Sequence, residues 1–81
     1  MKHLIKEYYY DRFDKLNFAI YVRKVALSSG TERFEPIAYQ STIRQLKRSM
    51  KEIYVKEALM NESVEELLNN LDLIDEKIKG E

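Results

Sequence analysis

Glycine and proline, the residues that most often interrupt regular structure, are scarce in this chain. Its 81 residues include two glycines and one proline. A sheet protein normally needs more of these residues to build its turns. Lysine, glutamate, leucine and isoleucine are abundant instead, and most of them favour helices. The shortage of turn residues therefore predicts a mostly helical fold.

Residues 28–36 form the one segment that is typical of a loop. Gly30 suits the left-handed position just past a helix end, and Pro36 suits the first turn of the next helix. Further along the chain, Ser63 and Glu66 have the spacing of a capping box, which marks another helix start. These signals divide the chain into three predicted helices, at about residues 4–28, 36–59 and 63–79.

The apolar residues repeat at helical spacing in all three segments. The clearest pattern is a heptad seam with spacings of 4, 3, 4 and 3, formed by Tyr39, Ile43, Leu46, Met50 and Ile53. It covers too few heptads for an extended coiled coil, and an antiparallel hairpin of the two long helices accounts for it as well. The predicted fold class is therefore all-α: a single domain containing a three-helix bundle, built on that hairpin and completed by the shorter third helix.

The charges are balanced overall but unevenly distributed. Fourteen Lys and Arg residues offset fourteen Asp and Glu residues. Residues 1–56 hold 12 basic and 6 acidic residues, whereas residues 57–81 hold 2 basic and 8 acidic residues. This opposition favours attraction between the helices within a bundle, and the alternative is a pair of opposed faces for different partners.

Several functional classes have little support. The chain has no cysteine, which excludes disulfides and thiolate chemistry. Its longest uncharged stretch, residues 36–43, is far shorter than the roughly 18 to 20 residues of a membrane span. Residues 1–7 lack the apolar core of a secretory signal. We therefore expect the whole chain to be mature, cytoplasmic protein without a membrane partner.

Catalytic groups are also scarce. His3 is the single histidine, so no histidine dyad or histidine cluster for a metal can form. A glycine-rich phosphate loop is missing as well. The sequence predicts a protein that is not an enzyme and that has no cofactor and no metal.

Four cations at helical spacing form a basic face on the second predicted helix. They are Arg44, Lys47, Arg48 and Lys51. Such a face can follow a phosphate backbone, although an ordinary solvated helix face is the favoured interpretation. A helix-turn-helix motif fails on charge, because the third predicted helix would bring five acidic residues to the major groove.

Three residues lie away from the predicted apolar stripes, where contact with a partner would explain them. Tyr10 and Tyr21 lie outside both stripes of the first predicted helix, and tyrosine is frequent at binding hot spots. Stacking on unpaired bases is less favoured, because arginines do not alternate with these aromatic residues. Leu73 projects among polar residues of the third predicted helix, and both chance exposure and a partner contact account for it.

These features together favour a small protein-protein interaction module, an adaptor or inhibitor that occupies a surface on a larger protein. Phages and mobile elements often encode small proteins of this kind. Self-association as a homodimer is also expected, because a core of this size is only marginally stable. The alternative function is a nucleic-acid-binding regulator that uses the basic face.

Overall fold

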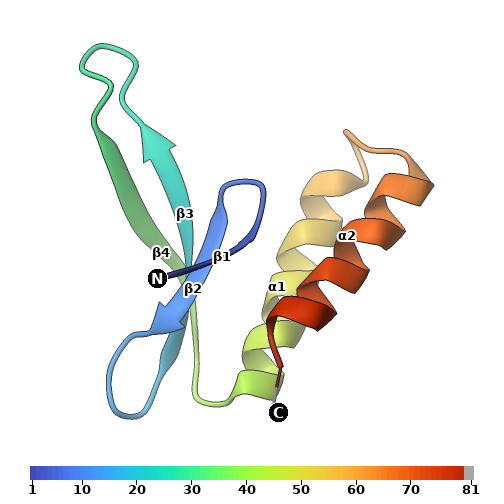
Figure 1. Ribbon diagram of the computed structural model, residues 1–81, viewed down its shortest axis with the longest axis horizontal. Coiled ribbons are helices and arrows are strands. Elements are labelled where there is room, and N and C mark those ends of the chain that lie inside the picture. The colour runs from blue at the N-terminus through green and yellow to red at the C-terminus, as the bar shows by residue number, and fades with distance from the viewer. Residues whose placement is uncertain (80–81) are drawn as a thin grey trace.

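The computed structural model describes residues 1–79 and shows an α+β fold. Four strands come first and two helices follow (Figure 1). Their bounds are β1 Lys2–Ile5, β2 Tyr8–Arg12, β3 Phe18–Val25, β4 Glu32–Gln40, α1 Ile43–Ala58 and α2 Val64–Lys77. The strands form one antiparallel sheet in the order β1-β2-β3-β4, so each strand pairs with its neighbour in the sequence.

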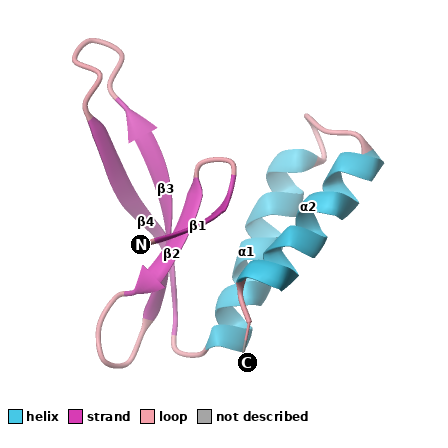
Figure 2. Cartoon of the chain, viewed as in Figure 1, coloured by secondary structure: helices cyan, strands magenta, loops and turns pink. Residues whose placement is uncertain are grey.

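Both helices lie on the same side of the sheet (Figure 2). Helix α1 packs on β3 and β4, and α2 packs on β1 and on α1. The hydrophobic core lies between these two layers, and its buried members are Leu4, Ile5, Tyr8, Tyr10, Ile20, Leu46, Met50, Tyr54, Ala58, Ile74 and Ile78. Within residues 1–79 no element covers the opposite face of the sheet.

The prediction of an all-α three-helix bundle is wrong, and the largest error concerns residues 4–28. This segment forms β1, β2 and β3 instead of a helix. Buried Tyr8 and Tyr10 alternate with the half-buried Tyr9 and Asp11, as a strand with one core-facing side requires. The segment also contains many aromatic and β-branched residues, which favour strands. Pairing between consecutive strands thus overrides the helical spacing of its apolar residues.

The prediction of a second helix at residues 36–59 holds only for the part that forms α1, Ile43–Ala58. Strand β4 extends through Gln40, and α1 begins only at Ile43. Thr42 is the N-cap, and its hydroxyl accepts a hydrogen bond from the Gln45 amide at 3.1 Å. Pro36 lies within β4, an edge strand, where a residue without an amide hydrogen is tolerated.

The turns between the strands use few glycines. Lys6 takes a left-handed φ of 49° between β1 and β2. Between β2 and β3, the Asp14 carboxylate accepts hydrogen bonds from the amides of Leu16 and Asn17, both at 2.8 Å. Only the β3–β4 turn places a glycine, Gly30, at positive φ. A shortage of glycine and proline therefore does not exclude a sheet.

The third predicted helix corresponds to α2. Ser63 is its N-cap, and the Ser63 hydroxyl accepts a hydrogen bond from the Glu66 amide at 3.2 Å. The helix ends at Lys77, two residues before the predicted end at 79. Neither helix within residues 1–79 has the length and apolar character that a membrane crossing requires.

Candidate functional site

The uncovered side of the sheet carries a group of aromatic side chains. Because neighbouring residues in a strand point to opposite faces, the residues between the core positions point away from the helices. Tyr9 pairs in register with His3 on β1 and with Tyr21 on β3. Ala19 and Tyr39 are likewise paired between β3 and β4. We call this surface the aromatic face, formed by His3, Tyr9, Phe13, Tyr21, Phe34 and Tyr39.

Edge-to-face contacts join five of these six rings into two groups. The Tyr9 ring centroid lies 4.9 Å from that of His3 and 5.0 Å from that of Phe34. Phe13, which follows β2, and Tyr39 on β4 form a second contact at 4.8 Å. This geometry is favourable for aromatic pairs and keeps the rings in place without a covering layer.

Three of the rings, those of His3, Phe13 and Tyr39, remain exposed, and the other three are half-buried. Phe13 is 51% exposed and Tyr39 is 49% exposed. Ala19, beside Tyr39 in the sheet, is fully buried although it lies outside the main core. Its small side chain is covered by its larger neighbours. The aromatic face therefore combines accessible rings with a small, buried alanine between them.

The charges on this face are paired. Arg23 forms an ion pair with Glu32 at 3.4 Å, and the amino terminus of Met1 contacts Asp11 at 3.2 Å. Burial, and then the Asp11 carboxylate, raise the pKa of the Tyr21 hydroxyl. Tyr21 is therefore protonated at neutral pH and can donate a hydrogen bond. The face is thus aromatic, close to neutral and able to form a few directed polar contacts.

The free edge of β4 is poorly suited to pairing with another strand. Pro36 contributes no amide hydrogen, and the register with β3 shifts between Ile20 and Tyr21. Prolines and bulges on edge strands prevent unwanted strand addition. A partner is therefore better accommodated by the face of the sheet than by this edge.

The structure separates the four cations of the predicted basic face into two pairs. Lys47 and Lys51 extend toward α2, where their ammonium groups lie 3.7 and 2.6 Å from the Asp75 carboxylate. Lys51 thereby lowers the pKa of Asp75. Arg44 and Arg48 are exposed, and neither has an ion pair within residues 1–79.

The other predicted partner-binding residues lie in three different environments. Tyr10 is 9% exposed, and its hydroxyl donates a hydrogen bond to the Lys77 carbonyl at 3.0 Å, so its side chain belongs to the core. Tyr21 is half-buried on the aromatic face. Leu73 is 38% exposed on α2. Of the seven predicted residues, Tyr21 alone belongs to the aromatic face.

Sequence reasoning missed most of that face. Tyr39 belongs to the heptad seam of the predicted helical core, and Phe34 lies within the predicted loop at residues 28–36. Residues 8–12 and 18–22 are rich in aromatic and apolar residues that favour strands, but neither stretch alternates apolar with polar residues, so the sequence does not show which side Tyr9 and Tyr21 share. The contact between Phe13 and Tyr39 depends on the sheet topology, and the local sequence does not encode it.

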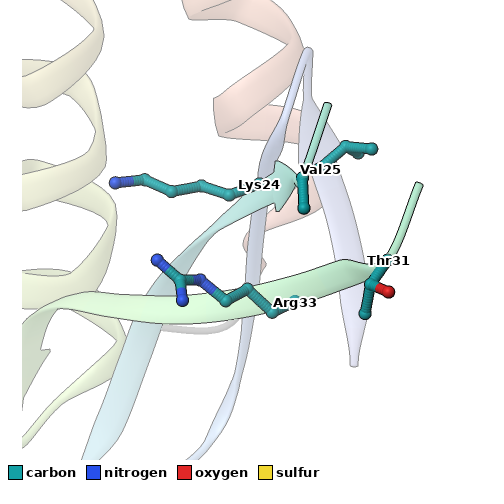
Figure 3. Close-up of a pocket in the computed structure, with 5 residues that line it drawn as sticks. Lys24, Val25, Thr31 and Arg33 are labelled. Atoms are coloured by element: carbon teal, nitrogen blue, oxygen red, sulfur yellow. The ribbon is translucent and has the colours of Figure 1, made fainter. Parts of the chain in front are cut away.

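A shallow pocket lies near the end of the β3–β4 hairpin (Figure 3). Lys24 and Arg33 extend in the same direction from neighbouring strands there. Glu35 contacts both cations, Lys24 at 3.0 Å and Arg33 at 2.5 Å. Their charges are thus partly compensated within the protein, which weakens this pocket as an anion site.

Comparisons of the chain with known protein families, characterised proteins and solved structures give no match. Within residues 1–79, no three histidine, aspartate or glutamate side chains gather where they could hold a metal ion. The aromatic face is therefore the candidate site, on the basis of its geometry alone.

Proposed function

We propose that this protein is a small non-catalytic interaction module that binds a larger protein through the aromatic face. The supporting observation is the set of accessible aromatic rings on an uncovered sheet surface. Tyrosine is enriched at binding hot spots because it provides a large contact area and a polar tip with few rotatable bonds. Such a module acts as an adaptor, or as an inhibitor that occupies a functional surface of its partner.

The charges favour a protein partner over a nucleic acid. Nucleic-acid binding depends on unpaired cations that follow the phosphates. On the aromatic face Arg23 is paired with Glu32, and Asp11 adds a carboxylate. On α1, Lys47 and Lys51 share Asp75. The complementary partner is a largely neutral protein surface with apolar contacts and a few hydrogen-bonding groups.

The experiment has two stages. The tagged full chain first captures partners from a nuclease-treated lysate, and mass spectrometry identifies them. A purified candidate is then tested for direct binding to the parent and to F13A/Y39A and Y21A variants. We expect each variant to raise the dissociation rate at least about tenfold, because a desolvated aromatic contact is lost.

Two control variants locate the binding surface. Leu73→Ala changes a partly exposed apolar side chain on α2, and Arg44→Glu with Arg48→Glu reverses the exposed cations of α1. Both controls should bind the partner like the parent. The proposal is overturned if the folded aromatic variants bind normally, or if nuclease abolishes capture and the R44E/R48E variant no longer binds nucleic acid.

A further inference from the structure

The tyrosine hydroxyls of this protein fall into two groups. In the core, three of them donate hydrogen bonds to other residues of the protein, and these belong to Tyr8, Tyr10 and Tyr54. On the aromatic face, three make no hydrogen bond within residues 1–79, and these belong to Tyr9, Tyr21 and Tyr39. The protein therefore uses the hydroxyls on one side of the sheet and leaves those on the other side free.

The free hydroxyls lie at the surface. Within residues 1–79, every buried side-chain oxygen or nitrogen has a hydrogen-bond partner. The hydroxyls of the half-buried Tyr9 and Tyr21 have none, so they are exposed to solvent although their rings are partly covered. Tyr39 is 49% exposed. A ligand that covers the aromatic face must therefore offer acceptors to three O–H donors, since a buried hydroxyl without a partner is costly.

The aromatic face offers a ligand few other polar groups. Its charges are paired, Arg23 with Glu32 and the amino terminus with Asp11. The His3 ring already forms a hydrogen bond with the Lys6 carbonyl at 2.7 Å. The main-chain amides of paired strands point along the sheet toward neighbouring strands and not toward the face. Charge complementarity thus favours an uncharged ligand that brings hydrogen-bond acceptors.

We propose that the aromatic face binds a proline-rich segment of its partner in the polyproline II conformation, an inference that rests on the proposed function and specifies its partner. A polyproline II segment has no internal hydrogen bonds, so its carbonyl groups are free to accept them. Proline has no amide hydrogen, so the segment demands few acceptors in return. Its pyrrolidine rings are uncharged and apolar, which suits the aromatic rings and the paired charges of the face.

Other backbone conformations fit these donors less well. An added strand needs unpaired main-chain groups, which only a sheet edge offers, and Pro36 interrupts the free edge of β4. A helix uses most of its carbonyls in its own hydrogen bonds, so the tyrosines would depend on its side chains. A polyproline II segment also loses little conformational entropy on binding, because proline restricts it beforehand.

The size of the face defines the length of the probe. Four residues separate Tyr9 from Phe13, one in each group of contacting rings, which is roughly 13 Å of extended chain. A polyproline II helix rises about 3.1 Å per residue, so about five residues reach from one ring group to the other. A peptide of ten prolines, about 31 Å long, covers both groups.

The test titrates the full chain with this peptide, its ends blocked, and follows the backbone amides by NMR. We expect saturable shifts in the sheet, with a dissociation constant below about 1 mM. A flexible Gly-Ser peptide of the same length should cause none. Tyr21→Phe and Tyr39→Phe each remove one donor and keep the ring, and each should raise the dissociation constant about threefold to tenfold. F13A/Y39A should raise it at least about tenfold, and Leu73→Ala on α2 should bind like the parent.

Three results would overturn the inference: no shifts at millimolar peptide, equal shifts with the Gly-Ser peptide, or parent-like binding by the folded F13A/Y39A variant. Parent-like binding by a Y21F/Y39F variant would overturn it as well, because the hydroxyls would then not donate to the segment. The proposed function fails separately. A captured partner that needs Phe13 and Tyr39 but is not displaced by the proline peptide supports the proposed function and overturns this inference alone.

Discussion

The Lys6 ammonium lies 2.8 Å from the Glu62 carboxylate and joins the β1–β2 turn to the turn between the two helices. The Glu62 side chain is only 7% exposed. It also accepts hydrogen bonds from the Tyr54 hydroxyl and from the Asn70 amide. One carboxylate therefore links the sheet to both helices.

The first prediction concerns the dependence of stability on pH. The hydrogen bond from Lys6, followed by that from Tyr54, lowers the pKa of Glu62 from its ordinary value of 4.5. The folded state thus holds a proton on Glu62 less tightly than the unfolded state does. This contribution to stability is complete above pH 4.5 and is lost as the pH falls through the lowered pKa.

Glu62→Gln tests this relationship. The variant should melt below the parent at neutral pH, and the difference in melting temperature should shrink as the pH falls from the ordinary value of 4.5 toward about 3. Glu52→Gln, at an exposed position of α1, should follow the parent at every pH. A difference between parent and Glu62→Gln that is independent of pH would show that the Glu62 charge does not stabilise the fold.

The second prediction concerns the hydroxyl of Tyr54, whose side chain is fully buried. This hydroxyl donates to Glu62 and accepts a hydrogen bond from Asn70 at 2.7 Å. Tyr54→Phe keeps the ring but removes one hydrogen bond from each partner in a buried network, which should cost about 1 to 3 kcal/mol of unfolding free energy in urea denaturation. Tyr39→Phe removes an exposed hydroxyl and should change stability by less than about 0.5 kcal/mol. Equal effects of the two changes would show that the hydrogen bonds of the buried Tyr54 hydroxyl do not stabilise the fold.

The third prediction concerns the packing of α1 on the sheet. Leu46 is fully buried in the core. Leu46→Ala should lower the free energy of unfolding by about 2 to 5 kcal/mol, enough to unfold much of a small domain. Leu16, 77% exposed in the β2–β3 turn, provides the control, because Leu16→Ala removes the same atoms without leaving a cavity. A parent-like melting curve for Leu46→Ala would show that Leu46 does not contribute to the core.

The two helices illustrate how much of this fold was predictable. Local chemistry defines the start of α2, since Ser63 caps it within the same four residues that the sequence indicates. The buried stretch of α1 likewise follows the heptad seam from Ile43 to Ile53. Side chains within a helix contact neighbours three or four residues away, so their pattern is visible in the sequence.

The sheet was not predictable by the same reasoning. Ile5, Tyr9, Leu16 and Ile20 have a spacing that suits a helix, and three of the four lie in strands. A strand is stabilised by a partner strand, and the pairing of Tyr9 with Tyr21 crosses a turn built without glycine. Asp14 and Lys6 form the turns that the shortage of glycine was expected to exclude. The aromatic face was missed for the same reason, since it exists only after the strands have paired.

The last prediction concerns Gly30, the glycine of the β3–β4 turn, whose φ is +70°. A Cβ atom at this position would meet no other atom within 4 Å, so Gly30→Ala has no steric neighbour to disturb. Its cost should therefore come only from the left-handed backbone, at about 1 kcal/mol. Gly30→Asn should cost less, because asparagine tolerates this conformation, and Ser28→Ala in the same turn should be neutral. Alanine stabilises a protein where the native backbone suits it, by restricting the unfolded chain. A higher melting temperature for Gly30→Ala would thus show that the turn adopts a negative φ in solution.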